Sequence, residues 1–243
     1  MPERDRGVST HAIDRPVILL MGFAPAEGAR LDPSGALLAL LAANPPGGAE
    51  IRTQLLPPDS EAALLKAIEA LDRLLPDAVI GLGKGDNPSA LSVDRIAVNS
   101  DDRPDSGRAG TIETIDPAGP AAYFSTLPVH IMAERMQAGG IPAVISNAPG
   151  AYPCNRLYYA LLHYVAVRGK ETWFRRRPPA GLTSRIGFIR LPSSAQTSAG
   201  RGLPGHSPDL ESSLTGVVLA LESVIDYLAT PEARTFVPSP PGD

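Results

Sequence analysis

The residues that could do chemistry centre on Cys154, the single cysteine of the chain. An apolar, β-branched run over 141–145 precedes it, and a turn cluster over 147–150 follows that run. Beyond Cys154, apolar residues recur at helical spacing, which predicts that the cysteine lies at or near a helix N-terminus. Unpaired backbone N–H groups and the helix dipole favour a thiolate there, and a thiolate is a good nucleophile. The alternative is that Cys154 is a small buried apolar residue.

A cysteine nucleophile usually works with a base, and the histidines are the first candidates. His163 follows Cys154 by about 13 Å along a helix, so we expect it on the helix surface or in packing. His206 lies in a glycine- and serine-rich segment on the side of the sheet where a site is expected, and it could substitute as the base. The sequence places neither His11, in the polar N-terminal arm, nor His130, in the preceding helix, at the site. Each of them could equally be an ordinary solvated or packed histidine.

Length and composition indicate one α/β domain. The chain has 243 residues, of which 43% are hydrophobic. The net charge is -4, so the chain has no excess of positive charge to attract phosphates, and we expect no nucleic-acid partner. A single cysteine excludes an internal disulfide framework and fits a reducing compartment. The first fifteen residues carry no apolar signal-peptide core, and the apolar run 17–23 is too short to span a bilayer. These features predict a soluble, cytoplasmic protein that binds no membrane.

Strand and helix patterns alternate along the chain. Strands are predicted at 16–21, 51–56, 77–83, 95–99, 141–145 and 185–190, and helices at 33–43, 59–75, 126–139, after Cys154, and at 210–229. This alternation predicts a three-layer α/β/α sandwich with a mostly parallel twisted sheet. Sites in such folds lie beyond the C-terminal ends of the strands, so we expect the loops 22–28, 83–94, 147–154 and 190–206 to meet.

The chain divides into three regions by composition. Residues 1–15 form a polar N-terminal arm, and residues 16–230 form the α/β domain. A proline-rich tail over 231–243 is predicted to be disordered.

Four segments, in order along the chain, resemble the pyroglutamyl-peptidase I family, the pyrrolidone carboxyl peptidases. They are Gly22-Phe-Ala-Pro25, Asp94-Arg-Ile-Ala-Val-Asn99, the stretch from Gly119 to Tyr159 with its Ala148-Pro-Gly-Ala-Tyr-Pro-Cys154 turn, and Gly187-Phe-Ile-Arg-Leu-Pro192. The resemblance covers roughly residues 16 to 230 and implies an α/β/α sandwich.

The resemblance also implies a chemistry. Family members are cysteine peptidases that remove an N-terminal pyroglutamyl residue with a Cys–His–Glu triad, without a metal or cofactor, and commonly assemble as homodimers or homotetramers. Cys154 stands at the position of the family nucleophile, and Asp94 stands where the family has its glutamate. Arg190 stands where the family has its histidine.

Arg190 changes what the site can do. A guanidinium can stabilise a thiolate as an ion pair, but its pKa above about 12 prevents it from acting as a general base or acid. Asp94 could pair with Arg190 in a bidentate salt bridge, which would replace a catalytic dyad with a structural one.

The substrate pocket departs from the family pattern as well. Phe23 is kept, but Ala26 replaces a second phenylalanine that packs against the pyrrolidone ring in the family. The predicted substrate-binding residues are Phe23, Lys84, Arg103 and Asn155. Arg103 corresponds, across a short gap, to a family arginine near the oxyanion.

Three functions are open at this point. The first is a divergent cysteine hydrolase that cleaves a pyroglutamyl or related amide of a small peptide or N-acyl substrate through a Cys154 thioester. The second is a family member that has lost activity and binds a ligand or partner. The third is an enzyme that reuses Cys154 for acyl transfer or cyclisation.

Overall fold

The computed structural model describes residues 15–25, 32–102, 113–148, 150, 152–167, 170–172, 174, 176, 178–179, 182–192 and 209–235. Statements below about the fold and the site refer to these residues.

A six-stranded mixed sheet forms the centre of the molecule, with the order β2-β1-β3-β8-β4-β7. Its strands are β1 (Val17–Phe23), β2 (Glu50–Leu56), β3 (Ala78–Lys84), β4 (Leu91–Asp94), β7 (Ala143–Ser146) and β8 (Arg185–Leu191). Neighbouring strands pair in parallel except β4 and β8, which pair antiparallel. The predicted mostly parallel sheet is thus confirmed.

The strand β4 corrects one expectation. The segment 83–94 was predicted to be a loop, but Leu91–Asp94 forms a short strand between β8 and β7. The signal is weak because Ser92 and Asp94 interrupt the apolar pattern, although both side chains are buried. Because β4 runs against β8, it places Asp94 opposite Phe188, two residues from Arg190.

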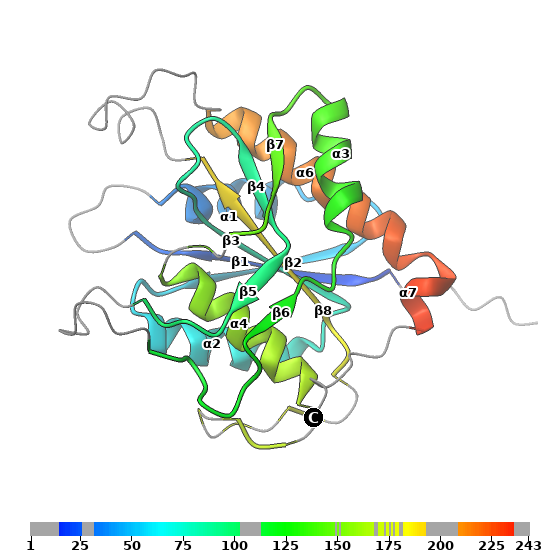
Figure 1. Cartoon of the computed structure of the whole chain (residues 1–243). Helices are drawn as coiled ribbons and strands as arrows, with labels where there is room; N and C mark the ends of the chain where they lie inside the picture. The colour runs from blue at the N-terminus through cyan, green and yellow to red at the C-terminus, as the bar shows by residue number, and fades with distance from the viewer. Residues whose placement is uncertain are drawn as a thin grey trace, which may run out of the picture.

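Helices cover both faces of the sheet, which confirms the three-layer sandwich (Figure 1). The helices α2 (Ser60–Leu74) and α4 (Cys154–Ala166) pack on one face, and α1 (Pro33–Ala43), α3 (Val129–Ala138) and α6 (Leu210–Leu228) pack on the other. Each face has its own apolar core cluster. The side chains of Asp32 and Asp59 accept hydrogen bonds from backbone N–H groups at the starts of α1 and α2.

A small antiparallel sheet of β5 (Ile96–Val98) and β6 (Ala122–Phe124) packs against α4 (Figure 1). The sequence predicts β5 within 95–99 but gives no sign of β6. Three residues are too few to show a strand period.

The C-terminal end corrects another expectation. Residues 231–243 were predicted to form a disordered tail, but Pro231–Thr235 form a short helix, α7, that packs on α6. The Arg185 guanidinium, at the start of β8, donates a hydrogen bond to the carbonyl of Ala233 and ties α7 to the sheet. Residues 1–14 and 236–243 lie outside the described part of the chain. No helix within the described part is long and apolar enough to cross a membrane.

Candidate active site

Cys154 is the first residue of α4 and is 6% exposed. Its sulfur lies against β3 at Gly83: a Cβ added to Gly83 would be 2.5 Å from the Cys154 sulfur and about 3.1 Å from the Phe188 ring. Only a residue without a side chain leaves this space open. The sequence thus places the cysteine at a helix start, and Gly83 lets the helix bring it onto the sheet.

Arg190 and Asp94 form a buried ion pair, which the sequence offered as a hypothesis. The Arg190 Nε lies 3.0 Å from both Asp94 carboxylate oxygens, and Nη2 lies 2.9 Å from Oδ1. The exposed fractions of the two residues are 6% and 2%. Charge-assisted bonds of this kind fix the guanidinium in one plane.

The same guanidinium also holds the turn that leads to Cys154. Its Nη2 donates to the Ser146 hydroxyl at 2.8 Å and to the Ala148 carbonyl at 3.3 Å. Its Nη1 lies 3.9 Å from Oδ2 of Asp86, whose side chain is 72% exposed. Arg190 therefore links β8, β4 and the end of β7.

Gly150 separates Arg190 from Cys154. A Cβ added to Gly150 would be 3.0 Å from the Arg190 Cδ and 3.5 Å from the Cys154 Cβ. The two side chains are therefore neighbours, but the hydrogen bonds of the guanidinium run to Asp94, Ser146 and Ala148.

Burial raises the pKa of the Cys154 thiol to about 12. The carboxylates of Asp94, Asp32 and Asp86 contribute to this rise, and the Arg190 charge opposes it. The expectation that the helix N-terminus makes Cys154 a thiolate is therefore wrong for this resting site. Loss of water around the sulfur outweighs the helix dipole, whose effect is a fraction of a charge.

Burial likewise raises the pKa of Asp94 to about 6, against the hydrogen bond and the charge of Arg190, which lower it. The free-energy cost of removing the carboxylate from water thus exceeds the stabilisation that the Arg190 guanidinium gives to its charged form.

Two of the predicted substrate-binding residues lie at the C-terminal ends of neighbouring strands. Phe23 is buried at the end of β1, in the same apolar cluster as Cys154, and its N–H donates to the Ser34 hydroxyl at 2.9 Å. Lys84 is exposed at the end of β3. Because side chains alternate along a strand and Gly83 faces Cys154, Lys84 points to the opposite face of the sheet.

Asn155 is buried beside the nucleophile, but its side chain bonds the backbone of β5. Its Oδ1 accepts from the Val98 N–H at 3.0 Å, and its Nδ2 donates to the carbonyls of Val98 and Ser100 at 3.0 Å each. These bonds hold β5 against α4, and substrate binding by Asn155 stays a prediction. Arg103 and the substituted Ala26 lie outside the described residues.

The two described histidines have partners away from Cys154. His163 is buried, with Nδ1 2.9 Å from the Tyr123 hydroxyl and Nε2 3.4 Å from an Asp116 carboxylate oxygen, which confirms it as a packing residue. Its pKa is lowered by burial. His130 lies 3.2 Å from the Arg95 guanidinium. His206 and His11 lie outside the described residues.

Sequence reasoning missed the roles of Ser146 and Gly83. A serine at the end of a predicted strand gives no signal of its own. A glycine that ends the strand 77–83 could have suggested a close approach of another side chain.

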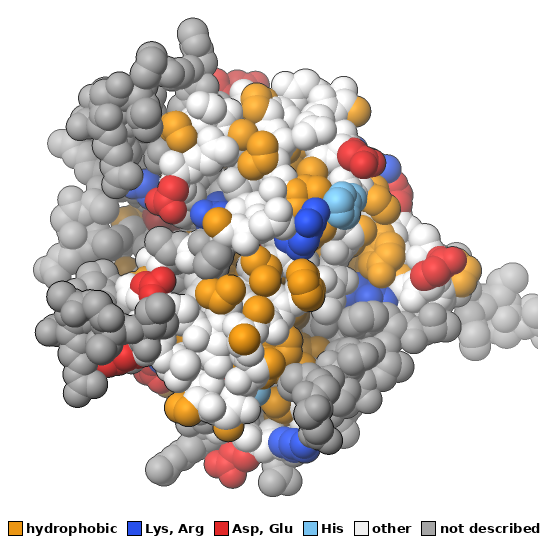
Figure 2. Space-filling view, viewed as in Figure 1, with side chains coloured by type: hydrophobic (Ala, Val, Ile, Leu, Met, Phe, Trp, Pro, Cys, Tyr) orange, Lys and Arg blue, Asp and Glu red, His pale blue; other side chains and the backbone are white. Residues whose placement is uncertain are grey.

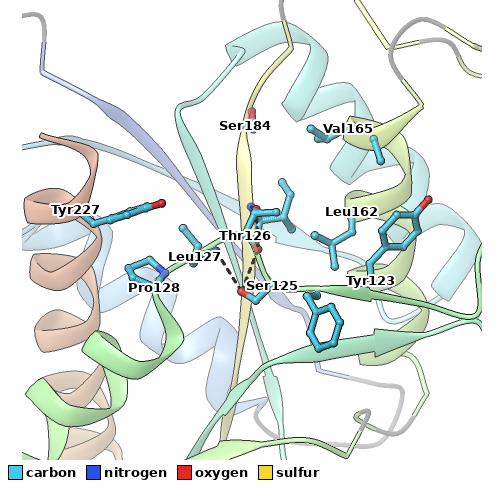
Figure 3. Close-up of a pocket in the computed structure, with 12 residues that line it drawn as sticks. Tyr123, Ser125, Thr126, Leu127, Pro128, Leu162, Val165, Ser184 and Tyr227 are labelled. Carbon is cyan, nitrogen blue, oxygen red and sulfur yellow. Dashed lines mark hydrogen bonds between the residues drawn. The ribbon is translucent and has the colours of Figure 1, made fainter. Parts of the chain in front are cut away.

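A cavity of about 560 Å³ lies elsewhere, at the start of β8 (Figure 3). It is lined mainly by apolar groups from β6, α4 and the segment before α3, with Tyr227 of α6 at one side. Ile186, in its wall, is about 13 Å along β8 from Arg190. This cavity is therefore separate from the Cys154 site. Within the described ranges, no three His, Cys, Asp or Glu side chains group in a way that could hold a metal ion.

Comparisons with known proteins agree with the fold. The family model described as pyroglutamyl peptidase matches residues 17–227. The pyrrolidone-carboxylate peptidase of Cupriavidus taiwanensis is 36% identical over 91% of this chain and 93% of its own, and pyrrolidone-carboxylate peptidase 1 of Ralstonia nicotianae is 33% identical over 86% and 93%.

Solved structures show the same likeness. The pyrrolidone carboxyl peptidase of Thermococcus litoralis superposes with a TM-score of 0.73 at 28% identity, covering 88% of this chain and 94% of that one. The pyroglutamyl peptidase I of Bacillus amyloliquefaciens gives a TM-score of 0.71 at 26% identity, covering 87% and 95%. With its match over nearly the whole domain, the chain belongs to the pyroglutamyl peptidase family of cysteine peptidases.

Proposed function

We propose that this protein is a divergent cysteine hydrolase that cleaves an N-terminal pyroglutamyl or related amide through a Cys154 thioester. The observation that carries the proposal is the setting of Cys154: it begins α4, lies against Gly83 and shares an apolar cluster with Phe23. Family membership supports the substrate class, a small peptide or N-acyl compound.

The proposed mechanism is slow because the site lacks the histidine of the family triad. Amide cleavage needs a thiolate, stabilisation of the oxyanion and a proton for the leaving nitrogen. Arg190 provides positive charge but cannot exchange a proton near neutral pH. The loss of a general acid or base typically lowers the rate by about 10²–10⁴-fold.

A second candidate is a binding protein that keeps the pocket without turnover. The bidentate pair of Arg190 and Asp94 favours it, because the two residues at the triad positions bind each other. The raised pKa of Cys154 also favours it, because little of the thiol is ionised at neutral pH.

We further propose that the protein acts in the cytoplasm as a homodimer or homotetramer. A single cysteine suits a reducing compartment. The assembly is an inference from the family resemblance.

Turnover of a fluorogenic pyroglutamyl amide at high enzyme concentration tests the proposal. The wild type is compared with Cys154→Ala, with Arg190→His, and with Arg190→His combined with Asp94→Glu. Weak activity that Cys154→Ala abolishes and Arg190→His raises supports a hydrolase. If only the Arg190→His variants are active, the binding protein is the better description.

A further inference from the structure

The leaving group is the difficulty that the site poses for an amide. When a thiolate adds to an amide carbonyl, the nitrogen must be protonated before the C–N bond breaks. Without a proton donor, the intermediate expels the thiolate and returns to substrate. The groups beside Cys154 therefore decide which leaving groups can depart.

Arg190 cannot be that donor. Its Nε and Nη2 hydrogens bind Asp94, Ser146 and the Ala148 carbonyl, and a guanidinium does not release a proton at neutral pH.

Two other described groups near the site, Asp94 and Tyr158, are no better placed to donate a proton. Both oxygens of Asp94 accept bonds from Arg190. The Tyr158 hydroxyl donates to the Asp94 backbone carbonyl at 3.3 Å, and burial raises its pKa above the ordinary value of a phenol.

Aryl esters and thioesters avoid this difficulty. Their leaving oxygen or sulfur departs as an anion, with a conjugate acid of pKa about 8.5 for a thiol or about 10 for a phenol. Burial raises the pKa of Cys154 to about 12, so these groups are less basic than the attacking sulfur and leave before it.

We propose that the Cys154 site is an aryl-ester and acyl-thioester hydrolase of the pyroglutamyl or related N-acyl type, with amides as poor substrates. This rests on the proposed function in one respect: that Cys154 is the nucleophile. It differs in the bond that is broken.

The reaction balances with water alone. The Cys154 thiol releases its proton to solvent, and its sulfur forms a bond to the acyl carbon. The C–O or C–S bond then breaks, and the leaving group departs with the electron pair and is protonated by solvent. Water attacks the Cys154 thioester, which releases the free acid and restores the thiol.

The test is a series of pyroglutamyl substrates that differ in leaving group: substituted phenyl esters, an alkyl thioester and an anilide. We measure kcat/KM for the wild type, Arg190→His and Cys154→Ala. In the wild type, kcat/KM should fall steeply as the leaving-group pKa rises. The ratio of ester to anilide turnover should exceed that of Arg190→His by about 10²–10⁴-fold, the usual value of a general acid.

Two further variants test for another proton donor: Asp94 within the site, and His206, which lies outside the described residues. The slope is that of log kcat/KM against the leaving-group pKa. If this slope is shallow in the wild type and becomes steep in His206→Gln or Asp94→Asn, the substituted residue donates the proton and the inference is overturned. If neither substitution changes a steep slope, the inference is supported.

The outcomes separate this inference from the proposed function. Cys154-dependent anilide cleavage with a shallow slope sustains the amide hydrolase and overturns the ester preference. Cys154-dependent ester cleavage with little anilide cleavage supports the ester preference and overturns the amide hydrolase. If no substrate is turned over faster by the wild type than by Cys154→Ala, both are overturned.

Discussion

At the scale of single residues, Arg190 and Asp94 account for most of what is unusual about the site. In a pair with both members buried, each charge depends on the other for solvation. The pair orders the approach to Cys154 through Ser146, yet it leaves the thiol in its neutral form. Two predictions concern the charges of these residues.

The first prediction is that Cys154 reacts like a thiol of high pKa. Its rate of alkylation by iodoacetamide should rise about tenfold per pH unit from pH 7 to beyond pH 9, because only the thiolate reacts and burial places its pKa near 12. The same protein unfolded in urea is the control and should level off above about pH 8.5. A plateau below pH 8 in the folded protein would show a stabilised thiolate instead.

The second prediction is that Arg190→Met destabilises the protein more at pH 8 than at pH 5. Burial already raises the pKa of Asp94 to about 6, and loss of Arg190 removes the two effects that lower it. A carboxyl with a raised pKa in the folded state stabilises the fold fully at acid pH, and that contribution is lost as the pH rises through this pKa. In Arg190→Met the pKa of Asp94 in the folded protein is higher still, so the loss of stability continues to higher pH.

Urea unfolding at both pH values measures this difference. We expect a loss of about 3–5 kcal/mol at pH 8, the usual effect of leaving one buried charge without its partner, and a smaller loss at pH 5. Arg135→Met is the matched control, because it breaks the more exposed pair with Asp226 and should lower stability by about 1 kcal/mol or less at either pH. Equal losses at pH 5 and pH 8 for Arg190→Met would contradict this account.

At the scale of elements, the site depends on how closely α4 approaches the sheet. The helix begins at Cys154, directly over β3, and its next residue bonds β5. One helix start thus positions the nucleophile and anchors the small β5–β6 sheet. Two predictions test these contacts.

Gly83→Ala should lower the free energy of unfolding by about 1–3 kcal/mol, because the added methyl group meets the Cys154 sulfur and the Phe188 ring. Part of this loss should disappear in a Cys154→Ala background, where the sulfur is absent, with a coupling of at least about 0.5 kcal/mol. Gly47→Ala is the control, since its methyl group would have no atom within 4 Å. Additive losses in the double variant would show that the sulfur is not seated on Gly83.

Asn155→Ala should lower stability by about 1–3 kcal/mol, because a backbone N–H and two carbonyls lose their bonds to the side chain. Gln54→Ala, which removes a bond to the carbonyl of the neighbouring Leu55 on the edge strand β2, should have little effect. Chemical unfolding measures both. A rise in KM with unchanged stability would instead identify Asn155 as a substrate-binding residue.

At the scale of the whole molecule, hydrophobic side chains gather over the centre of the face that carries β5 and β6 (Figure 2). Elements on this face contribute Phe124, Ile131 and Val144, which are 68%, 48% and 40% exposed. An exposed apolar surface of this kind often marks a contact with another protein chain.

We therefore expect light scattering to give a mass of two or four times the 25.5 kDa chain. Phe124→Ser should shift the equilibrium toward the monomer. Leu65→Ser, which changes a 44% exposed leucine on α2, should not. A monomer at every concentration would contradict the expected assembly.

Much of the architecture was predictable from the sequence, because hydrophobic periodicity and caps act locally. The helix at 33–43 was predicted with the bounds observed, and the strands on either side of Cys154 differ from the prediction by a residue or two. The short strands β4 and β6 and the helix α7 were missed or predicted otherwise. Each is stabilised by contacts with distant segments rather than by its own pattern.

For the site, the sequence by itself determined that Cys154 is the single cysteine of the chain and that an arginine such as Arg190 cannot transfer a proton near neutral pH. The assignment of Cys154, Asp94 and Arg190 to the triad positions stays a prediction. Only the tertiary structure decided that Arg190 is bound to Asp94, a residue 96 positions away, and that burial raises the pKa of the Cys154 thiol. The physical reason is that a pKa depends on burial and on charges from the whole surrounding fold. A helix start favours a thiolate, but the sheet, α4 and the nearby carboxylates together reverse that preference.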